Sequence, residues 1–309
     1  MRGLLTIVMY HYVREIKDSL FPNVRGLELE GFRNQLDYLQ ERYTMITAQD
    51  LVHCVKRDAS LPDNACMLTF DDGYKDHIQY VFPELQARGI QGCFFPPARP
   101  IMAGTLLDVN AIHHILACAP SAEVVLQDLK SLCQVFGLSE TEFQKNWAYY
   151  AKPNRFDTAE VIFIKRMLQV GLPMAMRSQI ATVLFEKYVG RAESEFCRDL
   201  YMSVEDLRTL SRNGMYVGNH SYSHCWMSHE DIGSQSIEIS RSLEFLETIG
   251  APIEDWIMCY PYGDYNAQTI NILKRTGCAV GLTTKPGIAN LDEESAFELS
   301  RFDTNDFPQ

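Results

Sequence analysis

Two short polar clusters in the sequence contain the residue types that a hydrolytic metal centre needs. Asp71 and Asp72 are adjacent and precede Gly73, whereas His220 and His224 are four residues apart. Two imidazoles and one carboxylate can bind a divalent metal and leave a coordination position open for water. Such a site lowers the pKa of that water from about 15.7 to about 7, and the second carboxylate could accept its proton. The clusters therefore predict metal-assisted hydrolysis.

Each cluster has a simpler explanation when it is considered alone. Acids often cap the N-terminus of the next helix, where the helix dipole favours negative charge. A histidine near a strand end is usually a core or surface residue. On a helical turn, His220 and His224 would share one face, which would bring both imidazoles to one metal. The catalytic interpretation is stronger because an apolar strand is expected directly before the two acids, which places both carboxylates near the core.

The apolar pattern predicts the elements that position these clusters. Short apolar runs alternate with amphipathic helices, which indicates parallel strands with helices packed outside. Residues 71–72, 220–224 and 261–263 each follow the C-terminal end of an expected strand. In parallel α/β folds the loops at that edge build the active site. The predicted strands cover residues 4–12, 66–70, 90–95, 215–218, 256–260, 278–284 and 297–302.

The strand and helix rhythm is interrupted in the middle of the chain. From residue 105 to residue 201 the patterns are helical, and prolines separate them. The rhythm resumes afterwards, which favours an insertion over a separate linked domain. We therefore predict one domain over residues 1–309, with an all-helical insertion at residues 105–201.

Composition restricts the class of protein. The chain has 309 residues and a net charge of −12, so nucleic acid is not an expected partner. No apolar run reaches the roughly 20 residues of a membrane-spanning helix. The apolar N-terminal stretch is interrupted by His11 and Arg14, which is typical of a buried strand rather than a signal peptide. Nine cysteines without a Cys-x-x-Cys pair fit reduced thiols, so we expect a cytoplasmic protein.

Three motifs together carry a family resemblance. Residues 69–73 (Thr-Phe-Asp-Asp-Gly), 220–224 (His-Ser-Tyr-Ser-His) and 260–263 (Tyr-Pro-Tyr-Gly) resemble the first three motifs of the polysaccharide deacetylases of the NodB-homology group, carbohydrate esterase family 4. The resemblance covers residues 66–95 and 202–284. It implies an α/β fold with an irregular (β/α)7 barrel, a divalent metal, and removal of an N-acetyl group from an amino sugar. The ligand set favours Zn²⁺, with Co²⁺, Fe²⁺ or Mn²⁺ as alternatives.

The resemblance also implies roles for individual residues. Asp71 would be the general base, and Asp72 would bind the metal together with His220 and His224. The backbone N–H of Tyr262 would stabilise the developing oxyanion, which an amide hydrolase needs.

Two positions depart from the family pattern. Cys259 stands where better-known members have an arginine that pairs with the base, and Arg301 stands where they have the histidine of a Leu-x-His motif. We hypothesise that Arg301 orients Asp71, since a guanidinium pairs well with a carboxylate; the alternative is a surface arginine. His11, at the end of the first expected strand, is our candidate for the general acid, and a packed core histidine is the alternative.

Three functions fit these residues. The first is a metal-dependent hydrolase that removes an N-acetyl group from an amino sugar during assembly of a surface glycan or its precursor. The second is a cyclic imide or ureide amidohydrolase with the same fold. The third is a non-catalytic relative that binds carbohydrate. The sugar, the native metal, the oligomeric state and the role of the insertion do not follow from the sequence.

Overall fold

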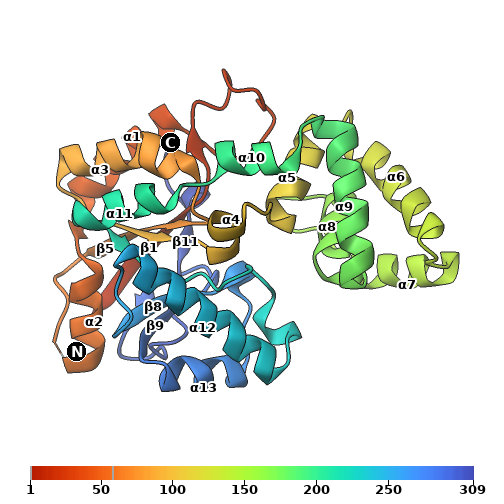
Figure 1. The fold of residues 1–309 in the computed structure, drawn as a ribbon. Helices are drawn as coiled ribbons and strands as arrows, with labels where there is room; N and C mark the ends of the chain where they lie inside the picture. Colours follow the sequence, from red (N-terminus) through yellow and green to blue (C-terminus); the bar gives the residue numbers. More distant parts are fainter. Residues whose placement is uncertain (1, 58) are drawn as a thin grey trace. The chain divides into compact units, whose positions relative to one another are not determined.

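A computed structural model describes residues 2–57 and 59–309, and its residues fall into two compact units (Figure 1). The larger, which we call the barrel unit, comprises Met1–Glu15, Gly26–Gly104 and Arg198–Gln309. The smaller, which we call the helical unit, comprises Thr105–Cys197 and also Ile16–Arg25, a segment that the sequence did not connect to it.

Seven parallel strands form an irregular ring in the barrel unit. Parallel pairing runs from β1 through β5 and β6 to β7, and separately between β8 and β9. Single parallel bridges, Asn219 with Met258 and Leu282 with Leu299, join these groups, and β11 pairs with β1. The expected (β/α)7 barrel is thereby confirmed. The ring strands are β1 (Leu4–Tyr10), β5 (Ala65–Asp71), β6 (Gly92–Phe95), β7 (Tyr216–Val217), β8 (Trp256–Cys259), β9 (Cys278–Leu282) and β11 (Phe302–Asp303).

Further short strands pair with the ring strands or with each other. The strand β10 (Ala289–Asn290) pairs antiparallel with β1, and β4 (Thr44–Met45) pairs parallel with β5. A separate ladder joins β2 (Val13–Arg14) to β3 (Leu27–Glu28). The strand predicted at residues 297–302 is too long, because only its last residue, Phe302, belongs to β11. The backbone N–H of residue 298 donates to the carbonyl of Ser295 and that of residue 300 donates to the Glu294 side chain, so this part of the chain is a loop.

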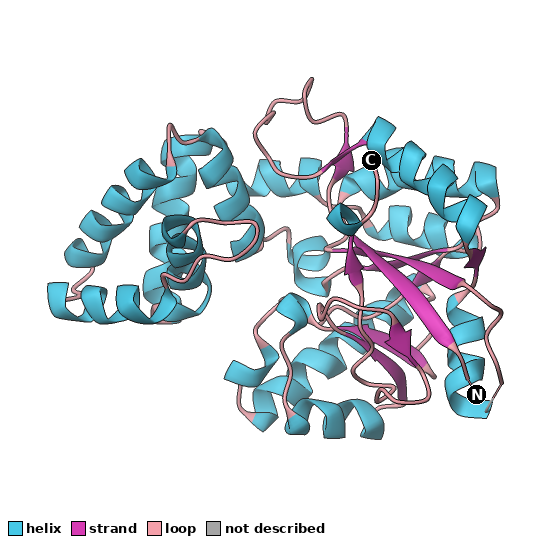
Figure 2. Ribbon diagram, turned by 180° about the vertical axis from the view of Figure 1, so that it is seen from behind, coloured by secondary structure: helices cyan, strands magenta, loops and turns pink. Residues whose placement is uncertain are grey.

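Helices surround the strands of the barrel unit, as Figure 2 shows from behind. Side chains cap several of them: Ser203 and Asp206 form a capping box, and Asn266 forms another with Thr269. The helices are α1 (Leu29–Arg42), α2 (Ala48–Arg57), a π-helical turn (His77–Val81), α3 (Phe82–Arg88), α4 (Ala98–Ala103), α11 (Val204–Arg212), α12 (Ile232–Ile249) and α13 (Ala267–Arg275).

The alternation of side chains along β5 divides the apolar core and sets the direction of the Asp71 side chain. In β5, Cys66, Leu68 and Phe70 pack in one cluster with residues of α1 and α3. Ala65 and Met67 face the opposite way, into a cluster with residues of β8 and β9. Because side chains alternate along a strand, Asp71 at the end of β5 shares the second face.

The helices of the helical unit pack against one another. Phe21, in the joining segment Ile16–Arg25, contacts His114 and Phe196 with ring centroids 5.1 and 5.6 Å apart. No helix among the described residues is long and apolar enough to cross a membrane. The helices are α5 (Asp108–Cys118), α6 (Ala122–Val135), α7 (Glu140–Tyr150), α8 (Ala159–Arg166), a π-helical turn (Met167–Gly171), α9 (Met174–Val189) and α10 (Glu193–Leu200), which extends past the end of the unit.

Candidate active site

The two aspartates at the end of β5 face in different directions because the chain turns sharply between them. Asp71 is the last residue of the strand, and Asp72 adopts a left-handed backbone with φ 70°. Gly73 follows at φ 68°, where a Cβ atom would lie 2.7 Å from Pro96, so only glycine fits. Both carboxylates are buried, at 1% and 3% exposed.

Asp72 lies against the two histidines in an arrangement that fits a divalent metal. Its Oδ1 atom is 3.4 Å from His220 Nε2 and 3.2 Å from His224 Nε2. Ligand atoms about 2.0–2.2 Å from a tetrahedral metal lie about 3.3–3.6 Å from one another, close to these values. Oδ1 has no hydrogen-bond partner among the described residues, which is costly for a buried carboxylate without a cation. The three residues can therefore hold a divalent metal.

The histidines converge through a loop, and not through the helical turn that their four-residue spacing would also allow. Ser221 and His224 have φ values of 60° and 59°, which no right-handed helix contains. Side chains stabilise this loop: Asn219 Oδ1 accepts a hydrogen bond from Ser221 N at 2.8 Å, and Ser221 Oγ accepts one from His224 N at 2.9 Å. Glu238 of α12 accepts three more, from Ser223 N, Ser223 Oγ and the backbone N–H of residue 222.

Two hydrogen bonds orient the ligand atoms toward a common point. His220 Nδ1 is 2.7 Å from the carbonyl oxygen of Cys259, which can only accept, so this nitrogen carries a proton and Nε2 is the nitrogen that a metal would bind. The hydroxyl of Tyr74 donates to Asp72 Oδ2 at 2.6 Å, which leaves Oδ1 facing the histidines. Tyr74 is fully buried and stacks on Tyr12, with ring centroids 4.1 Å apart.

Asp71 is held by a buried arginine, Arg301, which follows it by 230 residues in the sequence. Arg301 donates from Nη1 to Oδ1 at 3.0 Å and from Nη2 to Oδ2 at 2.9 Å. Its Nε donates to the carbonyl of Thr283 at 2.7 Å. Arg301 is 1% exposed, so it is not a surface residue. The Cys259 thiol, at the end of β8, donates to Asp71 Oδ2 at 3.3 Å.

This pair keeps Asp71 ionised. Burial alone would raise the pKa of the Asp71 carboxyl, but the positive charge of Arg301, with smaller contributions from His220 and His11, lowers this pKa to about 2. Asp71 raises the pKa of Arg301 in turn, against the effect of burial. At neutral pH the site therefore contains a carboxylate and a guanidinium, with both carboxylate oxygens bonded.

The remaining predicted residues lie at the same edge of the barrel. His11 Nε2 is 4.0 Å from Asp71 Oδ2, and the His11 side chain is 40% exposed, so it is not a packed core histidine. Tyr262 has φ 58°, and its ring centroid is 4.6 Å from that of His224. Tyr262 also stacks on Trp226, with centroids 4.5 Å apart.

The structure thus gathers all seven predicted site residues, and it adds three that the sequence did not single out. Tyr74, Trp226 and Glu238 orient or contact the predicted groups. The position of Tyr74, directly after Asp-Asp-Gly, is a signal that could have identified it. Glu238 lies on a long helix whose pattern predicts only that it faces away from the core.

Comparisons with known proteins agree with the motifs. Residues 181–281 match the family model described as polysaccharide deacetylase, which confirms the resemblance to that family. The putative polysaccharide deacetylase YxkH of Bacillus subtilis (strain 168) is 25% identical over 93 residues, which are 30% of this chain and 33% of that protein. The poly-beta-1,6-N-acetyl-D-glucosamine N-deacetylase of Escherichia coli (strain K12) is 23% identical over 295 residues, 94% of this chain and 35% of that protein. The chain therefore spans about a third of the length of these relatives.

Solved structures share the fold. A deacetylase of Streptococcus pyogenes, PplD, has a TM-score of 0.61 at 14% identity and covers 98% of this chain and 93% of its own. IcaB from Ammonifex degensii has a TM-score of 0.56 at 18% identity and covers 97% of this chain and 91% of its own. At these identities the likeness shows a common fold.

Proposed function

We propose that this protein is a metal-dependent hydrolase that removes the N-acetyl group from an amino sugar in a glycan or glycan precursor. The observation that carries the proposal is that the two adjacent carboxylates, Asp71 and Asp72, have different partners. Asp72 faces two imidazole nitrogens, whereas Asp71 is ionised and faces a guanidinium. A binding protein has no evident use for the second, separately held carboxylate.

Asp72, His220 and His224 would hold the metal, and Zn²⁺ suits two nitrogens and one oxygen best, with Co²⁺, Fe²⁺ or Mn²⁺ as alternatives. When bound there, a metal would polarise an amide carbonyl and make water more acidic. The buried position of the three ligands excludes bulk water from the ligand atoms, which strengthens electrostatic interactions in the site.

Asp71 would act as the general base. Its low pKa keeps it ready to accept a proton from the attacking water at neutral pH, and Arg301 fixes the direction of its oxygens. Arg301 would therefore be a positioning residue that replaces the family's usual arginine, whose place Cys259 takes.

His11 would return a proton to the leaving amine. Its imidazole lies beside Asp71 and is partly exposed, so it can reach a substrate nitrogen and exchange protons with solvent. Tyr262 would direct its backbone N–H to the oxyanion that forms at the acetyl carbonyl. The left-handed backbone of Tyr262 sets the direction of that N–H, and the stack on Trp226 stabilises this conformation.

The proposed substrate is an N-acetylated carbohydrate, and the name of the Escherichia coli relative makes β-1,6-linked N-acetylglucosamine a sensible first choice. The cytoplasmic location stays a prediction, which fractionation of the source cells would test.

Acetate release tests the function. The protein is stripped of metal, reloaded with Zn²⁺ or Co²⁺, and offered N-acetylglucosamine, its oligomers, nucleotide sugars and small cyclic imides. We expect metal-dependent acetate release from an acetylated sugar, and loss of release in Asp71→Asn with metal still bound. Turnover of imides alone would instead select the cyclic amidohydrolase. Sugar binding without turnover under any metal would select the non-catalytic relative.

A further inference from the structure

The helical unit contains a cavity of about 240 Å³ that shares no residue with the candidate active site. We call it the Lys165 pocket. Its lining comes from the joining segment Ile16–Arg25, from α5, from the start of α6, and from α8 with the residues just before it. Asn23 closes one side, because its Nδ2 atom donates to the carbonyl of Ala117 at 3.2 Å and so holds the segment against α5.

Residues spaced along one side of each helix form the wall of the pocket. Just before and within α8, the lining residues recur at intervals of four, which places them on one side of the helix: Asp157, Val161 and Lys165. The helix α5 contributes the neighbouring side chains of Leu116 and Ala117. The pocket therefore has a charged part and an apolar part.

A buried carboxylate holds two cationic side chains in the charged part. Asp157, with a side chain only 8% exposed, accepts from Arg25 Nη1 on Oδ1 at 2.7 Å and from Lys165 Nζ on Oδ2 at 2.6 Å. The same Nη1 atom donates to the carbonyl of Phe156 at 2.7 Å. These contacts orient both cations before any ligand arrives, so binding to them costs little side-chain entropy.

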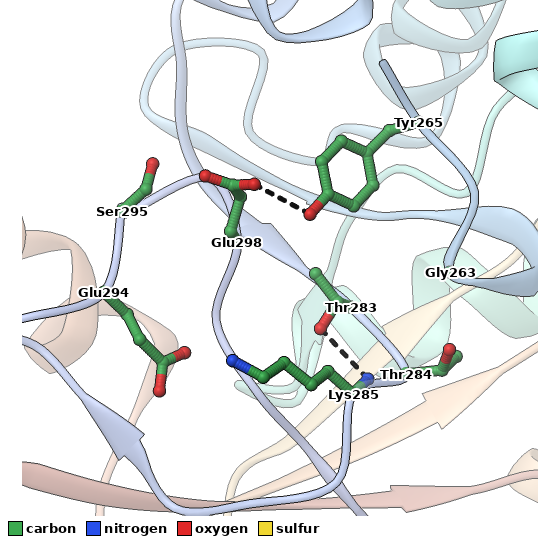
Figure 3. A pocket seen from close by; sticks show the side chains of 8 residues that line it. All are labelled: Gly263, Tyr265, Thr283, Thr284, Lys285, Glu294, Ser295 and Glu298. Atoms are coloured by element: carbon green, nitrogen blue, oxygen red, sulfur yellow. Dashed lines mark hydrogen bonds between the residues drawn. The ribbon is translucent and has the colours of Figure 1, made fainter. Parts of the chain in front are cut away.

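Both cations keep hydrogen-bond donors that no described residue uses. In Arg25 these are the Nε and Nη2 groups, and in Lys165 they are two of the three ammonium N–H groups. Two positive charges face one carboxylate here, although the net charge of the chain is −12. The polar cavity of about 430 Å³ in the barrel unit is the opposite case, because it combines Lys285 with Glu294 and Glu298 (Figure 3). Of these two cavities, the Lys165 pocket is the one that suits an anion.

The apolar part of the pocket limits the kind of anion. An apolar cavity of about 150 Å³ takes up a benzene molecule, so a cavity of about 240 Å³ has room for a body of that size with a carboxylate attached. A carboxylate can accept hydrogen bonds from a guanidinium and an ammonium group at the same time. Its single negative charge also equals the excess positive charge of the pocket, whereas a phosphate carries more charge and has no apolar body.

We propose that the Lys165 pocket binds a small monocarboxylate with an apolar body of about six carbon atoms. Its carboxylate takes the unused N–H groups of Arg25 and Lys165, and its apolar body lies against Leu116, Ala117 and Val161. The bound anion thereby joins the segment Ile16–Arg25 to α5 and α8. This site goes beyond the proposed hydrolysis, because it requires neither the metal nor a carbohydrate.

Calorimetry on the metal-stripped full chain tests the site with benzoate as the probe. Benzamide has the same shape without the charge, and inorganic phosphate has charge without an apolar body. We expect benzoate to bind at least about tenfold more tightly than either, because only benzoate uses both parts of the pocket. Absence of benzoate binding at about 10 mM, or phosphate binding as tight as that of benzoate, would overturn the proposal.

Three variants test where benzoate binds. Lys165→Met removes the charge and leaves Arg25 to pair with Asp157, whereas Val161→Phe fills the apolar part and leaves both cations. Each should weaken benzoate binding at least about tenfold. Lys187→Met is the matched control, since Lys187 also pairs with an aspartate, Asp128, in the helical unit. Its affinity for benzoate should equal that of the wild type, and thermal unfolding checks the fold of each variant.

Hydrogen exchange gives a second readout that depends on neither catalysis nor the folding of a variant. In the wild type, benzoate should slow amide exchange in Ile16–Arg25 and in α8, and it should leave exchange at the end of α9 unchanged. Protection confined to other segments, or benzoate affinity unchanged in both Lys165→Met and Val161→Phe, would show that benzoate binds elsewhere and would refute the site. Acetate release from sugars enters none of these measurements, so the deacetylase proposal and this one can fail separately.

Discussion

Replacing Arg301 with glutamine should move the acid limb of the pH–rate profile upward. Asp71 must be ionised to act as a base, and Arg301 is the largest influence that opposes the effect of burial on its pKa. With Arg301 present, this pKa is about 2, below its ordinary value of 3.8. Without the guanidinium, burial dominates, and the pKa of Asp71 should rise above 3.8, a shift of at least about two pH units.

The direction of this shift follows because the ionised form of Asp71 is the active one. A base with a lowered pKa works at every pH above that pKa and is lost only as the pH falls through it. The wild type should therefore show no acid limb from Asp71 above pH 4, whereas Arg301→Gln should acquire one. The difference between 3.8 and about 2 also corresponds to about 2 kcal/mol of folding stability at neutral pH, lost as the pH falls from about 4 toward about 2.

The assay is kcat/KM for acetate release between pH 4 and pH 9, which reports groups in the free enzyme. Metal content is measured at each pH, because protonation of His220 or His224 would also remove activity. Arg301→Lys is the matched control, because it keeps a positive charge but cannot form two hydrogen bonds to the carboxylate. Its rate should fall, whereas its acid limb should stay at low pH, as in the wild type. An acid limb in Arg301→Gln at the same pH as in the wild type, with metal fully bound, would refute the reasoning.

Three further substitutions probe neighbouring contacts. Tyr74→Phe removes the hydroxyl that holds Asp72 Oδ2, and should weaken metal binding about tenfold to a hundredfold in competition with a chelator; unchanged affinity would contradict this positioning role. Cys259→Ala leaves the pairing of Asp71 with Arg301 intact and should reduce kcat less than tenfold in the acetate assay, because the weak thiol donor adds little to a charged pair. His11→Ala should lower kcat about a hundredfold or more with unchanged metal content, and full activity would remove it from the mechanism.

The sequence predicts the site well where chemistry is linked to strand ends. The buried strand β5 is a continuous apolar run that stops at two aspartates. The sequence therefore indicates both where the strand lies and at which end the candidate site residues follow it. The capping boxes at Ser203 and Asn266 are equally local, because each joins residues three positions apart. Arg301 was recognised because it occupies a position at which a histidine was expected, although its pairing with Asp71 is established only by the fold.

What the sequence does not predict depends on contacts between distant residues or on unusual backbone. The loop at residues 220–224 relies on left-handed φ angles at Ser221 and His224, and because neither residue is glycine, the local sequence does not indicate this conformation. The segment Ile16–Arg25 joins the helical unit through Phe21 and residues about a hundred or more positions away, which leaves no local pattern. The short pairing of β11 with β1 is likewise set by ring closure rather than by propensity.

The pairing of Asp71 with Arg301 also makes the base depend on a segment that is far along the chain from the strand that carries it. The two residues are 230 positions apart. The metal ligands are all present once the chain has passed His224, but the base remains unpaired until the segment that carries Arg301 docks between β1 and β9. A chain truncated before Arg301 would therefore keep its ligand set and lose the partner of its base. Such a fragment is expected to bind metal while lacking an oriented base.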